Sequence, residues 1–95
     1  MYGTVAHLRI KKGMEARIID VMKEYEGAKI PGQVAGYVYR LDKAPDEYYM
    51  CAVFDSRESY RANAASPAQD ARYRKLAALL DGEPEWHDGE VIFSS

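Results

Sequence analysis

Two histidines are the first candidates for chemistry in this chain. His7 lies near the start, and His87 lies near the end between Trp86 and Asp88. The imidazole pKa is close to neutral pH, so either side chain is a candidate general base. A histidine on a strand of a small protein is more often a packed or surface residue, and that interpretation stays open for both. Neither belongs to a ligand spacing such as H-x-x-x-H or C-x-x-C, so no metal site is predicted.

The single cysteine is the next reactive group. Cys51 falls in an apolar stretch with Met50 and Val53, and no candidate base adjoins it. A buried, inert thiol is the expected role. One cysteine excludes an internal disulfide and suits a reducing compartment, so a cytoplasmic location is expected.

Aromatic side chains are the third group, because a pocket for a flat apolar ligand is built from them. They are spread over the whole chain as Tyr37, Tyr39, Tyr48, Tyr60, Tyr73, Trp86 and Phe93. Among these, Tyr37, Tyr60 and Trp86 are predicted to line a ligand pocket between a sheet and its helices. The alternative, that most of the aromatic rings simply fill the core, stays open.

Apolar periodicity predicts the elements that position these residues. Period-two alternation indicates four strands, at about 2–11, 33–43, 47–55 and 85–94. A stripe with three- and four-residue spacing predicts a helix at about 14–26. Their order, with a helical region between the third and fourth strands, is the ferredoxin-like βαββαβ arrangement of an α+β protein. Right-handed crossovers then place the helices on one face of a four-stranded antiparallel sheet.

The helical region carries two start signals. Asp55 with Glu58 has the form of a capping box and predicts a short helix at about 56–64. Ser66 followed by Pro67 predicts a longer helix that runs to about Leu80.

The two middle strands are apolar on both sides. Ala35, Tyr37 and Tyr39 alternate with Val34, Gly36 and Val38, whereas a half-solvated strand alternates apolar with polar. The helices suffice for one face only, so the other face needs a different cover. A two-fold homodimer through this open face is the prediction, since closed dimers are the commonest assembly. Tyrosine hydroxyls that tolerate water are the alternative.

Length and composition exclude several classes of protein. Ninety-five residues form one domain, residues 1–95. The net charge of −2, with acidic and basic residues interspersed, speaks against a nucleic-acid or anionic-membrane surface. No apolar run approaches the roughly 18 residues of a membrane helix, and no signal peptide is expected.

Several segments together resemble the antibiotic biosynthesis monooxygenase family, which has the dimeric α+β barrel fold. They are the first strand with its Ile10-Lys-Lys-Gly13 turn, the stretch Phe54 to Asn63, Ser66-Pro67, the helix ending at Leu80, and the last strand. The resemblance covers nearly the whole chain. The family includes cofactor-independent quinone-forming oxygenases, haem-degrading oxygenases and proteins without a defined activity.

The resemblance also implies site residues. The family's oxygenases use an Asn, a Trp and a Tyr from the helical region, and Asn63 and Tyr73 stand at a spacing similar to that Asn and Tyr. Asn63 would hydrogen-bond a phenolate oxygen and Tyr73 would pass a proton, with His7 or His87 as a candidate base and no cofactor. Pro67 stands where the Trp would lie. The haem-degrading members match less well, because the long helix has no histidine.

Two functions follow from this pattern. The first is a cofactor-independent monooxygenase-like activity on a small aromatic or quinol substrate. The second is a non-catalytic, small-ligand-binding or stress-related dimeric barrel protein, which the missing Trp and the lack of a clear base favour.

Overall fold

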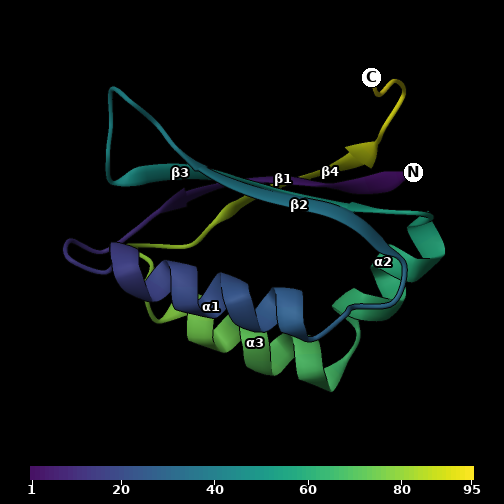
Figure 1. Cartoon of the computed structure of the whole chain (residues 1–95), viewed down its shortest axis with the longest axis horizontal. Coiled ribbons are helices and arrows are strands. Elements are labelled where there is room, and N and C mark those ends of the chain that lie inside the picture. The colour runs from purple at the N-terminus through teal and green to yellow at the C-terminus, as the bar shows by residue number, and fades with distance from the viewer.

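The strands and helices follow the predicted order (Figure 1). The computed structural model describes residues 1–95. Along the chain lie β1 (Tyr2–Arg9), α1 (Glu15–Gly27), β2 (Gln33–Arg40), β3 (Glu47–Phe54), α2 (Arg57–Ala64), α3 (Pro67–Ala77) and β4 (Glu85–Glu90). None of the helices is both long and apolar enough to cross a membrane.

The four strands form one antiparallel sheet in the order β2-β3-β1-β4. All three helices lie against one of its faces, as right-handed crossovers require (Figure 1). The ferredoxin-like α+β prediction is therefore confirmed. We call the covered side the helix face and the uncovered side the open face.

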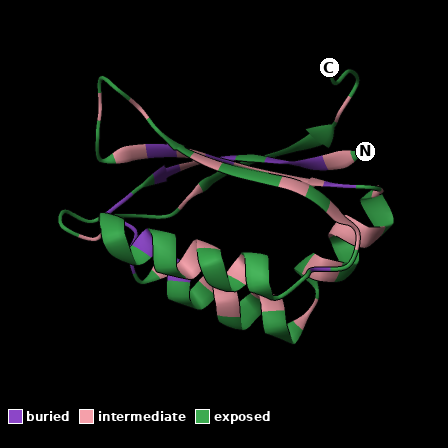
Figure 2. Ribbon diagram, viewed as in Figure 1, coloured by how far each residue is buried: buried purple, intermediate pink, exposed green.

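Strand register assigns each side chain to a face. Ala6 and Leu8 of β1 are buried on the helix face, and they pair with Met50 and Tyr48 of β3. Val5, which precedes Ala6 in the chain, points to the open face and is 44% exposed. Buried residues accordingly gather in the two central strands, whereas β2 and β4 are largely exposed (Figure 2).

The helix caps confirm one expectation and correct another. Ser66 caps α3 by accepting from the Gln69 backbone N–H, with Pro67 in the first turn, as predicted. The cap of α2 is Ser56, whose Oγ accepts from the Ser59 N–H at 3.1 Å, so the prediction of Asp55 as N-cap is wrong. Asp55 lies one residue too early and accepts from the Ser59 hydroxyl instead.

The helix α3 and the strand β4 both end earlier than expected, and the hydrogen bonds of adjacent segments explain where they stop. The backbone N–H of Lys11 donates to the Leu79 carbonyl, and Leu80 bridges Ile10, so α3 ends at Ala77. β4 ends at Glu90, because that residue already pairs with the first residue of β1. The chain beyond β4 has no strand to pair with, and Ile92 and Phe93 are 91% and 82% exposed.

The core fills one end of the space between sheet and helices. Its largest completely buried side chains are Leu8 of β1, Ile18 of α1 and Leu76 of α3. Towards the other end of the sheet the helix-facing residues become small: Gly36, Ala52 and Thr4 lie side by side on β2, β3 and β1. Large side chains fill the first region, and this row of small ones leaves the second region hollow.

Candidate active site

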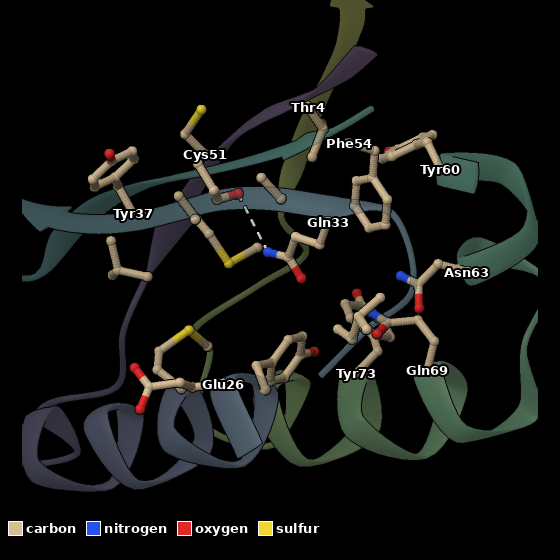
Figure 3. Close-up of a pocket in the computed structure, with 18 of the residues that line it drawn as sticks. Thr4, Glu26, Gln33, Tyr37, Cys51, Phe54, Tyr60, Asn63, Gln69 and Tyr73 are labelled. Carbon is tan, nitrogen blue, oxygen red and sulfur yellow. Dashed lines mark hydrogen bonds between the residues drawn. The ribbon is translucent and has the colours of Figure 1, made fainter. Parts of the chain in front are cut away.

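A cavity of about 820 Å³ lies over this row of small residues (Figure 3). Its volume falls within the roughly 300–1,000 Å³ typical of small-molecule sites. Sixteen of the 24 residues around it are hydrophobic, so it suits a mainly apolar ligand. Its walls come from every layer of the fold: β2 and β3, α1 with Ile19, Met22 and Tyr25, the α2–α3 region, and Trp86 of β4.

Four of the predicted site residues meet at this cavity. Asn63 and Tyr60 come from α2, Tyr73 from α3 and Trp86 from β4. The Tyr73 and Trp86 rings both line the cavity and lie 5.9 Å apart between centroids, inclined at 55°. The helix to which Pro67 belongs has no tryptophan, yet an indole reaches the cavity from β4.

A polar network fixes the amide of Asn63. Its Oδ1 accepts from Nη2 of Arg72 at 3.4 Å, and Nε of Arg72 donates to Oε1 of Gln69 at 3.2 Å. The Arg72 guanidinium also lies over the ring of Tyr25, 5.6 Å from its centroid. Because Arg72 occupies the oxygen, the Asn63 nitrogen is the end that points into the cavity (Figure 3).

Sequence reasoning missed Arg72 entirely. The contact joins residues nine positions apart across the connection from α2 to α3, so neither helix's own periodicity reveals it. The one available signal is the three-residue spacing of Gln69 and Arg72, which places their side chains together on α3.

Two cavity tyrosines stay protonated at neutral pH. Burial, together with Asp88, whose Oδ1 accepts from the Tyr60 hydroxyl at 2.8 Å, raises the pKa of Tyr60 to about 12, against the opposing effect of a hydrogen bond with Thr4. Burial likewise raises the pKa of Tyr25, partly opposed by a hydrogen bond with Gln69 and by the charge of Arg72. Neither tyrosine is therefore suited to act as a base there.

The two histidines do not reach the cavity. Strand alternation turns both to the open face, where His87 pairs in register with Val5. His7 Nε2 lies 2.9 Å from Glu47 Oε1, and His87 Nε2 lies 3.0 Å from Glu85 Oε1. The structure therefore separates them from Asn63 and Tyr73 by the full thickness of the sheet.

Tyr37 occupies an intermediate position. It adjoins the cavity, but its side chain points from β2 to the open face, as does that of its register partner Cys51 (Figure 3). Tyr37 is 68% exposed. Nowhere do three or more His, Cys, Asp or Glu side chains gather in a way that could hold a metal ion.

Comparison with known families agrees with this geometry. The family model for antibiotic biosynthesis monooxygenases matches residues 1–75. The chain belongs to this family. Family membership confirms the resemblance drawn from the sequence and places the chain among proteins that form dimeric α+β barrels.

Solved structures of antibiotic biosynthesis monooxygenases superimpose well on the structure of this chain. A mutant of SnoaB, a cofactor-independent oxygenase from Streptomyces nogalater, has a TM-score of 0.84 at 19% identity, covering 98% of this chain and 94% of SnoaB. A candidate antibiotic biosynthesis monooxygenase from Chloroflexus aurantiacus has a TM-score of 0.81 at 23% identity, covering 99% and 95%. Both identities are below 25%, so the likeness is one of fold. No curated protein matches the sequence.

Proposed function

We propose that this protein is a cofactor-independent monooxygenase that acts on a small aromatic or quinol substrate in the cavity. The observation that carries the proposal is the Asn63 amide nitrogen, held by Arg72 so that it faces an apolar space of suitable size. A fixed donor in a water-poor site stabilises a developing oxyanion far better than water does. The oxygenase SnoaB, similar in fold, supports the same chemistry.

The proposed reaction uses the substrate's own electrons. An anthrone-type substrate loses a proton to give a phenolate-like anion, whose oxygen Asn63 stabilises. The anion transfers electrons to O₂, and the carbon–oxygen bond that forms gives a hydroperoxide. Loss of water then leaves a carbonyl, so a CH₂ group and O₂ become C=O and H₂O. Tyr73 would relay the substrate proton to bulk water and later return a proton to the peroxide anion, while the apolar walls keep the anion poorly solvated.

Oxygen uptake tests the proposal directly. Wild-type protein mixed with dithranol should consume one O₂ per substrate, at a rate proportional to protein concentration and above the rate of autoxidation. With ¹⁸O₂ the product quinone should carry one labelled oxygen. Uptake that is independent of protein, for both dithranol and menadiol, would contradict the proposal.

The second candidate function is non-catalytic binding of a small aromatic ligand. The position of both histidines on the open face favours it, because no histidine base is then available in the cavity. An anthraquinone should in this case bind and quench the fluorescence of Trp86, the single tryptophan, while no oxygen is consumed.

Arg72 should act as a positioning residue for the oxygenase reaction. Arg72→Met keeps an apolar stem but removes the donors, so the Asn63 amide is free to rotate. We expect kcat to fall about tenfold with KM nearly unchanged, since misplaced catalytic groups lower the rate more than ground-state binding. Steady-state oxygen uptake measures both constants.

Arg74→Met is the matched control for Arg72. It lies on the same helix but is 79% exposed and pairs with Asp70. Its kcat should equal that of the wild type. An equal loss in both variants would assign the effect of Arg72→Met to the stability of α3 rather than to the orientation of Asn63.

The assembly proposed for this chain is a homodimer through the open face. Val5, Tyr37 and Tyr39 on that face are 44%, 68% and 57% exposed, a large apolar area for a monomer to leave uncovered. The β2–β3 connection and the C-terminal segment both rise on this side of the sheet, flanking the face (Figure 1). The dimeric barrels of the family support the same arrangement.

A further inference from the structure

A β-bulge aims the side chain of Gln33 into the cavity. The register between β2 and β3 shifts between Gln33 and Ala35, so Val34 is an extra residue without a counterpart on β3. In a regular strand alternate residues share a face, and Gln33 would lie with Ala35 on the open face. Instead it pairs with the buried Phe54, faces the helices and lines the cavity (Figure 3). Bulges that redirect one side chain in this way are common beside active sites.

One hydrogen bond fixes the orientation of the Gln33 amide. Its Nε2 donates to the backbone carbonyl of Ala35 at 3.3 Å, the dashed line in Figure 3. Only the amide nitrogen can donate to a carbonyl, so this bond also places the amide oxygen. Gly36 leaves room for the arrangement, because a Cβ at that position would lie 3.0 Å from Nε2. The amide is therefore held at its nitrogen, and its oxygen is directed into the cavity (Figure 3).

The oxygen of Gln33 is the free acceptor among the amides of the cavity. Three amide side chains line it, those of Gln33, Asn63 and Gln69. Arg72 donates to the oxygens of Asn63 and Gln69, whereas no protein group donates to Oε1 of Gln33. Gln33 is half-buried and its Oε1 keeps accessible surface, so a ligand can reach this atom.

Gln33 and Asn63 present opposite polarity to the same space. In Figure 3 the Gln33 oxygen comes from the sheet and the Asn63 nitrogen from α2, and both are directed at the region between sheet and helices. An amide oxygen only accepts hydrogen bonds, whereas an amide nitrogen only donates them. A ligand that satisfies both groups therefore carries a hydroxyl for Gln33 and a second oxygen for Asn63.

We propose that Gln33 is a specificity residue that accepts a hydrogen bond from a hydroxyl group of the ligand. The inference rests on the proposed function of the same cavity and narrows its ligands to hydroxylated, reduced aromatic compounds. A quinone has carbonyl oxygens, which cannot donate to Gln33. One ring system should therefore bind more tightly as a hydroquinone than as a quinone, and the site favours substrate over product.

A hydroquinone and its own quinone test this assignment. The pair is 2,3-dimethyl-1,4-naphthoquinone and its hydroquinone, titrated calorimetrically into the protein with oxygen excluded. The methyl groups block the ring positions at which a quinone would alkylate Cys51. Wild-type protein should bind the hydroquinone about tenfold more tightly than the quinone. Gln33→Met keeps a similar side-chain length without the acceptor, so it should bind the two compounds equally, within about twofold.

Gly36→Ala is a second variant, and it leaves Gln33 itself in place. The added Cβ would crowd the Gln33 amide and displace it, since the end of that side chain moves more easily than the strand. The preference for the hydroquinone should fall several-fold. Alanine is tolerated in a strand at least as well as glycine, so the fold should survive.

Several results would overturn the assignment. They are equal affinity of the wild type for the two compounds, binding of neither, or an unchanged preference in Gln33→Met, as expected if the amide only secures the bulge. If Gln33→Met folds poorly, an unchanged preference in Gly36→Ala overturns it instead. Because oxygen is excluded, a failure of dithranol and menadiol to support oxygen uptake would reject the proposed reaction without affecting this measurement.

Discussion

Asn63→Ala is expected to lower the rate of oxygen consumption by about 10²–10³-fold, the usual effect of removing one donor to a developing oxyanion. The substitution leaves the backbone carbonyl of residue 63 in place, and that carbonyl accepts from the Ser66 N–H at 3.0 Å. Helix geometry should therefore survive, and the loss should appear in kcat. Stopped-flow oxygen uptake and a thermal melt of the same sample measure activity and folding together.

Asn63→Asp sharpens this prediction. Aspartate has nearly the shape of asparagine and can accept from Arg72 at least as well, but it presents an acceptor where the amide presented a donor. Its activity should be no higher than that of Asn63→Ala. If either variant keeps the wild-type rate, Asn63 does not stabilise the anion. Tyr73→Phe retains the ring beside Trp86 and serves as the comparison for loss of a hydroxyl alone.

The position of Tyr37 shows how far a single sequence can assign strand residues to the two faces of a sheet. Alternation correctly groups Tyr37 with Tyr39 and sets both apart from Val38. The alternation does not show which group of side chains faces the helices, since both groups are apolar. Strand pairing shows it: Val38 pairs with the buried Met50 of β3, whereas Tyr37 pairs with Cys51 on the open face. Tyr37 was thus expected in the pocket although its ring lies on the open face.

The histidines illustrate the same limit. Their positions on strands were predicted, but a strand carries its side chains to two different environments. His7 and the buried Ala6 are neighbours in sequence and lie on opposite faces of the sheet. By contrast, Asn63 and Tyr73 lie in the helical region predicted between the third and fourth strands. That region packs on one face, so both residues reach the same cavity.

The cavity itself has a sequence origin that only the register reveals. Gly36, Ala52 and Thr4 are unremarkable small residues on three different strands. Their significance comes from lying in one row across the sheet, beside rows that contain Met50 and Phe54. Long-range strand pairing creates the hollow, and no local pattern encodes that pairing.

Val5→Glu should dissociate the proposed dimer. On the open face Val5 lies in one row with Tyr37, Cys51 and His87, and so near the middle of the four-stranded sheet. A carboxylate there would be buried without a partner when two such faces meet, at a cost of several kcal/mol. The dissociation constant should rise by about 10²–10³-fold, and sedimentation velocity over a range of concentrations should show the shift to monomer.

Two control variants separate loss of the interface from loss of the fold. Val5→Thr keeps the β-branched shape that strands favour, so it should remain dimeric, with an affinity within about tenfold of the wild type. Ala71→Glu adds the same charge at an exposed position on α3, outside the cavity, and should leave sedimentation unchanged. If wild-type protein sediments as a monomer at high micromolar concentration, or if Val5→Glu stays dimeric, the open face is not the interface. Its exposed tyrosines would then face water through their hydroxyl groups, as an isolated sheet of this composition allows.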